Sequence, residues 1–155
     1  MSILEALRQT RVKCDQAQPD MLPRLHSPAC KCNGSGAIPD PRAAQAIAVL
    51  TNECGNCQGK GSFYDPWSER KESCYPCSKV GRIPNVTEGT LLQAARVLWP
   101  ECIVTVHGAR VEIGSSYKSD VDVWEHAPIH DNNVLAALEA ALTKAVLAEG
   151  KNNDD

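Results

Sequence analysis

Residues 54–61 read Cys-Gly-Asn-Cys-Gln-Gly-Lys-Gly, and residues 74–81 read Cys-Tyr-Pro-Cys-Ser-Lys-Val-Gly. A two-residue gap lets both thiolates of one turn point at one metal ion, and the following glycines permit the positive φ with which the chain leaves the turn. Sixteen residues separate the two pairs, which is the spacing of a tetrahedral four-thiolate zinc site. We therefore predict one structural zinc ion, with these ligands: Cys54, Cys57, Cys74 and Cys77. A redox pair is the alternative, but no βαβ pattern surrounds either pair.

A related stretch precedes these two, at residues 30–36, which read Cys-Lys-Cys-Asn-Gly-Ser-Gly. Two thiolates rarely hold a structural zinc ion alone, and Cys14 and His26 are the nearest additional ligands. One interpretation is therefore a second zinc site formed by Cys14, His26, Cys30 and Cys32. The other is that Cys30 and Cys32 are a degenerate repeat, or that Cys32 substitutes within a rearranged single site.

Repeats of the form CxxCxGxG are typical of the cysteine-rich zinc domain of DnaJ-type chaperones, which residues 30–81 resemble. The resemblance implies zinc ligation by the pairs Cys54/Cys57 and Cys74/Cys77. The chain departs from that family because it has three repeats where four are usual and Ala29 interrupts the first. It also lacks a J domain with its His-Pro-Asp motif, so the resemblance does not imply a co-chaperone function.

The motifs are also similar to the zinc part of the antitermination protein Q family of lambdoid phages. In that family, paired cysteine motifs lead directly into a helix rich in alanine and leucine. The comparable run here is residues 81–84, leading into residues 91–99. This resemblance implies a phage or prophage origin and a role as a nucleic-acid or RNA-polymerase-associated regulator.

Charge and hydrophobic patterning divide the 155 residues near Pro84. Residues 1–86 hold 11 Lys and Arg against 8 Asp and Glu, whereas residues 87–155 hold 5 against 11. In the first half, Ser2 and Glu5 form a capping box for a helix that extends to about residue 13, and Asp40-Pro41 begins an inserted helix. We expect four regions: an N-terminal helix and linker (1–25), a zinc module of irregular knuckle hairpins (26–84), an α+β domain (85–150) and a tail (151–155).

The α+β domain is expected to have the order helix, strand, strand, strand, helix. Thr87 caps a helix that stops before Pro100, and three strands follow over about residues 102–124. Asp131 then caps a long helix that Gly150 ends. This order predicts a small sheet with helices packed on one face.

Several classes of protein are excluded by the sequence. No run approaches the roughly 18 apolar residues of a membrane-spanning helix, and residues 1–13 lack the apolar stretch of a signal peptide. We therefore expect a cytoplasmic protein, whose cysteines need an explanation other than disulfides. Nothing resembles a phosphate loop or a nucleophile elbow. His126 and His130 lie near acidic residues, but at a strand end and a loop rather than on one helical face, so a non-enzymatic protein is favoured.

Two kinds of partner fit the residues around the zinc motifs. Phe63, Tyr64 and Trp67 could anchor a protein partner, although we favour the alternative that they cover the zinc knuckles, because a small zinc domain must bury its apolar area. A basic set could instead contact nucleic acid: Lys60, Arg70, Lys71, Lys79 and Arg82. A four-thiolate zinc site carries a charge of about −2, which reduces the positive charge of this half. The sequence therefore favours a zinc-stabilised adaptor that binds a protein partner.

Overall fold

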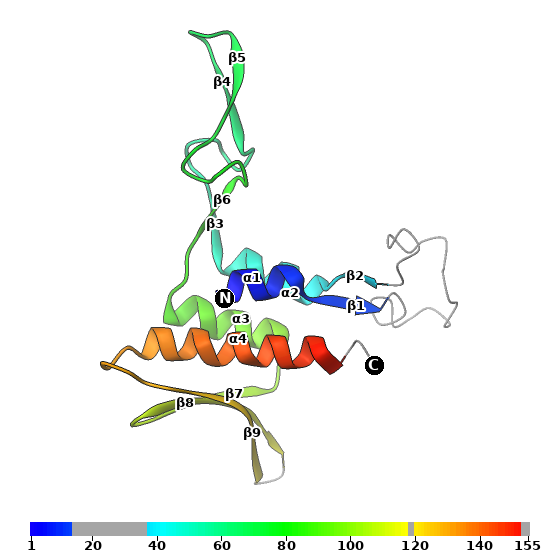
Figure 1. Cartoon of the computed structure of the whole chain (residues 1–155), viewed down its shortest axis with the longest axis vertical. Coiled ribbons are helices and arrows are strands. Elements are labelled where there is room, and N and C mark those ends of the chain that lie inside the picture. Colours follow the sequence, from blue (N-terminus) through cyan, green and yellow to red (C-terminus); the bar gives the residue numbers. More distant parts are fainter. Residues whose placement is uncertain (14–36, 118–119, 153–155) are drawn as a thin grey trace.

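The chain forms a three-layered body from which a long, narrow arm projects, as a computed structural model shows (Figure 1). The structure describes residues 1–13, 37–117 and 120–152. The arm is residues 51–84, and the body contains the four helices and the largest sheet. In the described part of the chain, no helix combines the length and the apolar character needed to cross a bilayer.

One layer of the body is an antiparallel sheet of three strands in the order β7-β8-β9. The strands are β7 (Cys102–His107), β8 (Arg110–Tyr117) and β9 (Asp120–Pro128). Val111, Ile113 and Ala127 are buried on the face that the helices cover. The register of β8 and β9 shifts between Ile113 and Gly114, where a bulge interrupts the pairing.

Four helices form the other two layers. They are α1 (Ile3–Gln9), α2 (Pro41–Val49), α3 (Glu88–Leu98) and α4 (Val134–Asn152). Helix α3 contacts β7 and α4 contacts β8 and β9, whereas α1 and α2 pack on α4 and α3 from the other side. The body is therefore an α+β structure, as the sequence predicts, and the helices of the described residues lie on one face of its sheet (Figure 1).

The two N-terminal helices belong to the same hydrophobic core as the C-terminal half. Leu7 of α1 and Leu50 after α2 are buried in one cluster with Leu91 and Leu142. The sequence places α1 in a linker region and α2 in the zinc module, and this packing differs from that division. The physical reason is that both helices carry an apolar face that the small zinc knuckles have no surface to cover.

Polar contacts also join the N-terminal helices to the rest of the body. Buried Asp40 caps α2 by accepting a hydrogen bond from the Arg42 backbone amide at 2.8 Å. The Arg42 guanidinium contacts Asp40 at 3.2 Å and Glu149 of α4 at 3.0 Å, and it donates to the Leu98 carbonyl. Burial alone would lower the pKa of Arg42, but the bonds to the two carboxylates outweigh it and raise that pKa.

Three predicted boundaries of the first and last helices are wrong, and one of them is the end of α4, which continues past Gly150 to Asn152. Helix α1 has the predicted capping box at Ser2 but ends at Gln9, because the chain continues as β1 (Arg11–Lys13), which pairs with β2 (Ala37–Pro39). Helix α4 is capped by Asn133, whose Oδ1 accepts from the Ala136 amide at 3.0 Å, rather than by Asp131. Asp131 has a positive φ of 52° and lies in the preceding turn.

The arm consists of two short ribbons with the cysteine motifs between them. At its base, β3 (Thr51–Glu53) pairs with β6 (Arg82–Pro84), and at its tip β4 (Ser62–Asp65) pairs with β5 (Arg70–Ser73). Thr51 lies opposite Pro84, so the chain enters and leaves the arm at neighbouring points. The arm is therefore an insertion between α2 and α3.

A substitution in α1 tests whether the first helix belongs to the core. Leu7 is 2% exposed, so Leu7→Ala should lower the free energy of unfolding of the body by about 2–5 kcal/mol. Leu92→Ala, at a leucine of α3 that is 38% exposed, is the matched control and should cost far less. Chemical denaturation followed by circular dichroism measures both. Equal losses for the two variants would show that α1 is not part of the core.

Candidate metal centre

Four cysteines of the arm are positioned to hold one metal ion. The Sγ atoms of Cys54 and Cys74 lie 3.7 Å apart, as do those of Cys57 and Cys77, and all four sulfurs lie within 4.8 Å of one another. Four sulfurs at the usual Zn–S distance of about 2.3 Å would be separated by about 3.8 Å in a tetrahedron. The four-sulfur set therefore fits a tetrahedral zinc ion, and among the described residues it is the one such group found.

The two knuckles are related to each other by reciprocal backbone contacts. The amide of Cys54 donates to the carbonyl of Gly81 at 2.9 Å, and the amide of Cys74 donates to the carbonyl of Gly61 at 3.0 Å. The first cysteine of each knuckle is thus hydrogen-bonded to the last glycine of the other knuckle. The second and third sequence repeats therefore form one symmetric pair.

Backbone amides also stabilise charge on the sulfurs. The amide of Gly61 donates to Cys57 Sγ, and the amide of Gly81 donates to Cys77 Sγ, both at 3.2 Å. These four residues occupy equivalent places in the two repeats. Hydrogen bonds from backbone amides to zinc-binding thiolates orient these ligands and favour their charged form.

The thiols of Cys74 and Cys77 differ in pKa because their surroundings differ. The side-chain amide of Asn56 donates to Cys74 Sγ at 3.5 Å, and this hydrogen bond is the main reason that the pKa of Cys74 falls to about 7. Burial raises the pKa of Cys77 to about 11. Thiolates are the form that ligates metals, so Asn56 is a site residue that the cysteine spacing alone did not reveal.

Two glycines, Gly61 and Gly81, lie where the backbone of one knuckle closely approaches that of the other. A Cβ on Gly61 would lie 2.2 Å from the Lys79 carbonyl oxygen, and a Cβ on Gly81 would lie 2.1 Å from the Gly59 carbonyl oxygen. Both residues also have positive φ, at 71° and 80°. The third repeat replaces Gly59 by Lys79, which retains a left-handed conformation with φ of 69°.

The remaining predicted zinc ligands lie outside the described residues. They are Cys14, His26, Cys30 and Cys32. The four described cysteines by themselves supply the four ligands of a tetrahedral site.

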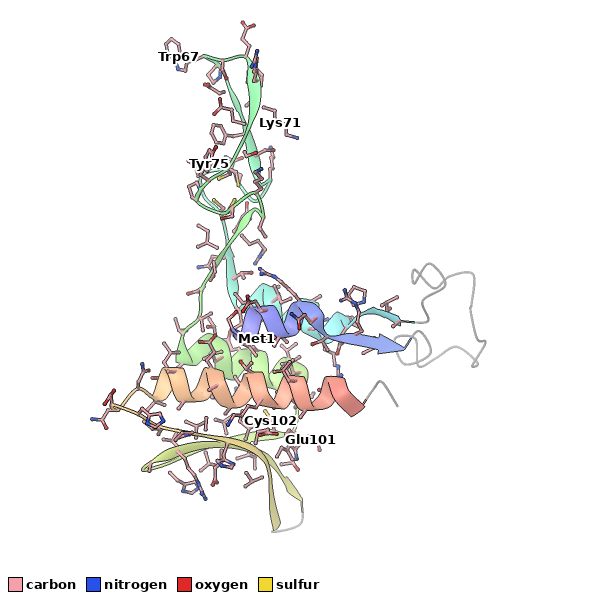
Figure 2. The ribbon with its side chains drawn as sticks, in the orientation of Figure 1. Met1, Trp67, Lys71, Tyr75, Glu101 and Cys102 are labelled. Atoms are coloured by element: carbon pink, nitrogen blue, oxygen red, sulfur yellow. The ribbon has the colours of Figure 1, made fainter. Side chains whose placement is uncertain are left out.

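Tyr64 and Trp67 do not cover the knuckles, contrary to the interpretation favoured from the sequence, whereas Phe63 is 36% exposed and lines a groove with Cys57. Trp67 is 94% exposed at the tip, Tyr64 is 64% exposed, and Tyr75 beside the metal centre is 85% exposed. Figure 2 shows Trp67 at the far end of the arm and Tyr75 near the sulfurs. The knuckles pack directly against each other, and among the described residues of the arm their four cysteines are the buried hydrophobic ones.

The five basic candidates are not equivalent. The Arg82 guanidinium is bound at the base of the arm, where it donates to Thr51 Oγ1 at 2.6 Å and to the carbonyls of Ala48 and Thr51. Lys60 and Lys71 line an open groove of about 570 Å³ beside the first knuckle. Arg70 lies opposite Asp65 in the tip hairpin, and Lys79 is exposed on the other knuckle.

Comparison with family models, curated proteins and solved structures finds no significant match to this chain.

Metal removal is expected to unfold the arm and leave the body folded. Cys57→Ser deletes one of four ligands, so the variant should lose its metal, and protease should then cut within residues 51–84. Cys102→Ser, at a cysteine of β7 outside the cluster, is the control and should retain metal. Elemental analysis and limited proteolysis, with and without chelator, measure these effects. Retention of metal by Cys57→Ser would exclude the four-cysteine centre.

The left-handed backbone at Lys79 generates a second prediction. Lys79→Gly should slow metal release and stabilise the arm by about 1 kcal/mol, because glycine adopts positive φ without strain. Lys60→Gly makes the same chemical change in the first knuckle at a residue without positive φ, and it should destabilise the arm. Hydrogen exchange of the Cys54 amide, which bonds to Gly81, reports both effects. The same sign for both variants would contradict the conformational argument.

Proposed function

We propose that this protein is a non-enzymatic adaptor whose zinc-stabilised arm binds a protein partner through its tip. The observation that carries the proposal is Trp67, which is 94% exposed at the end of an arm that projects from the body (Figure 2).

The metal would be structural. Four cysteines fill all four positions of a tetrahedral ion, which leaves no position for a water molecule or a substrate. The sulfurs are also buried: Cys54 and Cys74 have no exposed surface, and Cys57 and Cys77 are at most 5% exposed. Zinc in such a site contributes folding free energy rather than catalysis.

The tip is held in one conformation by local hydrogen bonds. Asp65 accepts from the backbone amides of Trp67 at 3.1 Å and Ser68 at 3.2 Å, and the bond from Trp67 is the main reason that the pKa of Asp65 is lowered. Glu69 completes the turn with a φ of 51° before β5 begins. A preorganised loop loses less entropy on binding, so the exposed indole of Trp67 is suited to anchor an interface.

The charge of the arm favours a protein over a polyanion. Residues 51–84 contain 5 Lys and Arg against 4 Asp and Glu, and a four-thiolate zinc site adds about −2. The arm is therefore near neutrality, whereas phosphate binding relies on a concentrated basic surface. We infer that Lys60 and Lys71, which line the groove beside the first knuckle, contact acidic side chains of the partner.

A second candidate function is a nucleic-acid or RNA-polymerase-associated regulator similar to the phage antitermination proteins. One observation favours it: the groove that contains Lys60 and Lys71 is also lined by Phe63 and Tyr64. Lysines beside exposed aromatic rings can bind the backbone and stack the bases of a single strand. Such binding would weaken steeply with salt.

Truncation of the anchor separates these functions. Trp67→Ala should weaken partner binding by about 30-fold, the cost of losing an interface tryptophan, while Val106→Ala on the sheet should not change it. The measurement is quantitative affinity capture combined with a photo-crosslinker at position 67, and both must identify the same protein.

Two results would contradict the adaptor proposal. In the first, the experiment finds no protein that both requires Trp67 for its capture and forms a crosslink to position 67. The other is that the chain captures RNA or DNA in a salt-dependent manner that Lys60→Glu and Lys71→Glu abolish, which would favour the second function.

A further inference from the structure

A pocket of about 390 Å³ lies in the body, at the end of α3 opposite the arm. It opens between the end of α3, β9 and the last turns of α4, and no residue of the arm lines it. Its volume is that of a site for a small ligand. The lining residues are Trp99, Trp124, Glu125, Ala145, Ala148 and Glu149.

Two tryptophans form adjoining walls of this pocket. The ring centroids of Trp99 and Trp124 are 6.1 Å apart and the ring planes are inclined at 64°. Trp99 is fixed in place because its Nε1 donates to Glu149 Oε2 at 3.0 Å. The faces of indole rings carry negative electrostatic potential and attract cations.

The bulge in β9 brings an aromatic ring and a carboxylate to the same pocket. Successive residues of a regular strand face opposite sides of a sheet. Here Ile113 pairs with Glu125 while Gly114 pairs with Val123, so Trp124 is the extra residue of the bulge. Neighbouring Trp124 and Glu125 consequently both line the pocket, which is an arrangement that bulges produce at binding sites.

The charge around the pocket is negative. Glu125 and Glu149 line it and no lysine or arginine does. Arg42 contacts Glu149, but the same guanidinium also pairs with Asp40, so these two carboxylates share one cation. Among the described residues, Glu125 has no ion pair. The C-termini of α3 and α4 lie nearby and add partial negative charge.

We propose that this pocket binds an organic cation with an alkylated ammonium head group. The indole faces and the alanines suit the alkyl groups, and the carboxylates suit the charge. A metal ion would need more oxygen ligands than the two carboxylates supply, and an anion would be repelled. The head group occurs both on free molecules of the choline type and on methylated lysine side chains.

Nuclear magnetic resonance of the three indole groups tests the proposal directly. Choline should shift the Nε1–H resonances of Trp99 and Trp124 in a saturable manner and leave that of Trp67 unchanged. The uncharged isostere 3,3-dimethylbutan-1-ol should bind at least about fivefold more weakly, because it keeps the shape and loses the cation–π attraction. A trimethyllysine peptide that binds more tightly than choline would identify a protein side chain as the ligand.

A charge-removing variant provides the matched comparison. Glu125→Gln keeps the shape of the pocket and should weaken choline binding by about fivefold or more. Glu101→Gln removes an exposed carboxylate two residues after Trp99 that does not line the pocket, and it should have no effect. The proposal is overturned if neither cation shifts the two indoles, if the isostere binds equally well, or if the two variants behave alike.

Discussion

The arm depends on one contact, the convergence of four buried sulfurs from two knuckles. Residues 51–84 contain no other buried hydrophobic side chains among those described, so nothing else draws the two halves of the arm together over their middle. The reciprocal hydrogen bonds between Cys54 and Gly81 and between Cys74 and Gly61 form only when the knuckles meet. Positions 61 and 81 require glycine because the convergence of the sulfurs brings the backbones of the two knuckles too close together for a Cβ atom.

The body is stabilised in the ordinary way, by apolar burial between helices and a sheet. Its core is formed by chain segments that precede the arm and segments that follow it. Helix α2 and helix α3 pack against each other although the whole arm separates them in sequence. Arg42 at the start of α2 adds polar links to Glu149 of α4 and to the Leu98 carbonyl of α3.

Local features of this fold could be predicted from the sequence, whereas the packing of distant segments against one another could not. The capping box of Ser2 and the four-cysteine spacing depend on neighbouring residues, and both are present in the structure. The partnership of α1 with α4 depends on contacts between distant segments, for which one sequence carries no signal. The Trp99–Trp124 contact could not be predicted for the same reason. Twenty-four residues separate the two tryptophans, and the orientation of Trp124 depends on a bulge in β9.

The pairing of Thr51 with Pro84 has an evolutionary consequence. Because the two ends of the inserted segment lie side by side, a short turn would suffice to join them. The helical body could therefore have existed before the knuckles were inserted, and a related chain could lose them, or exchange them for a different extension, without redesign of its core.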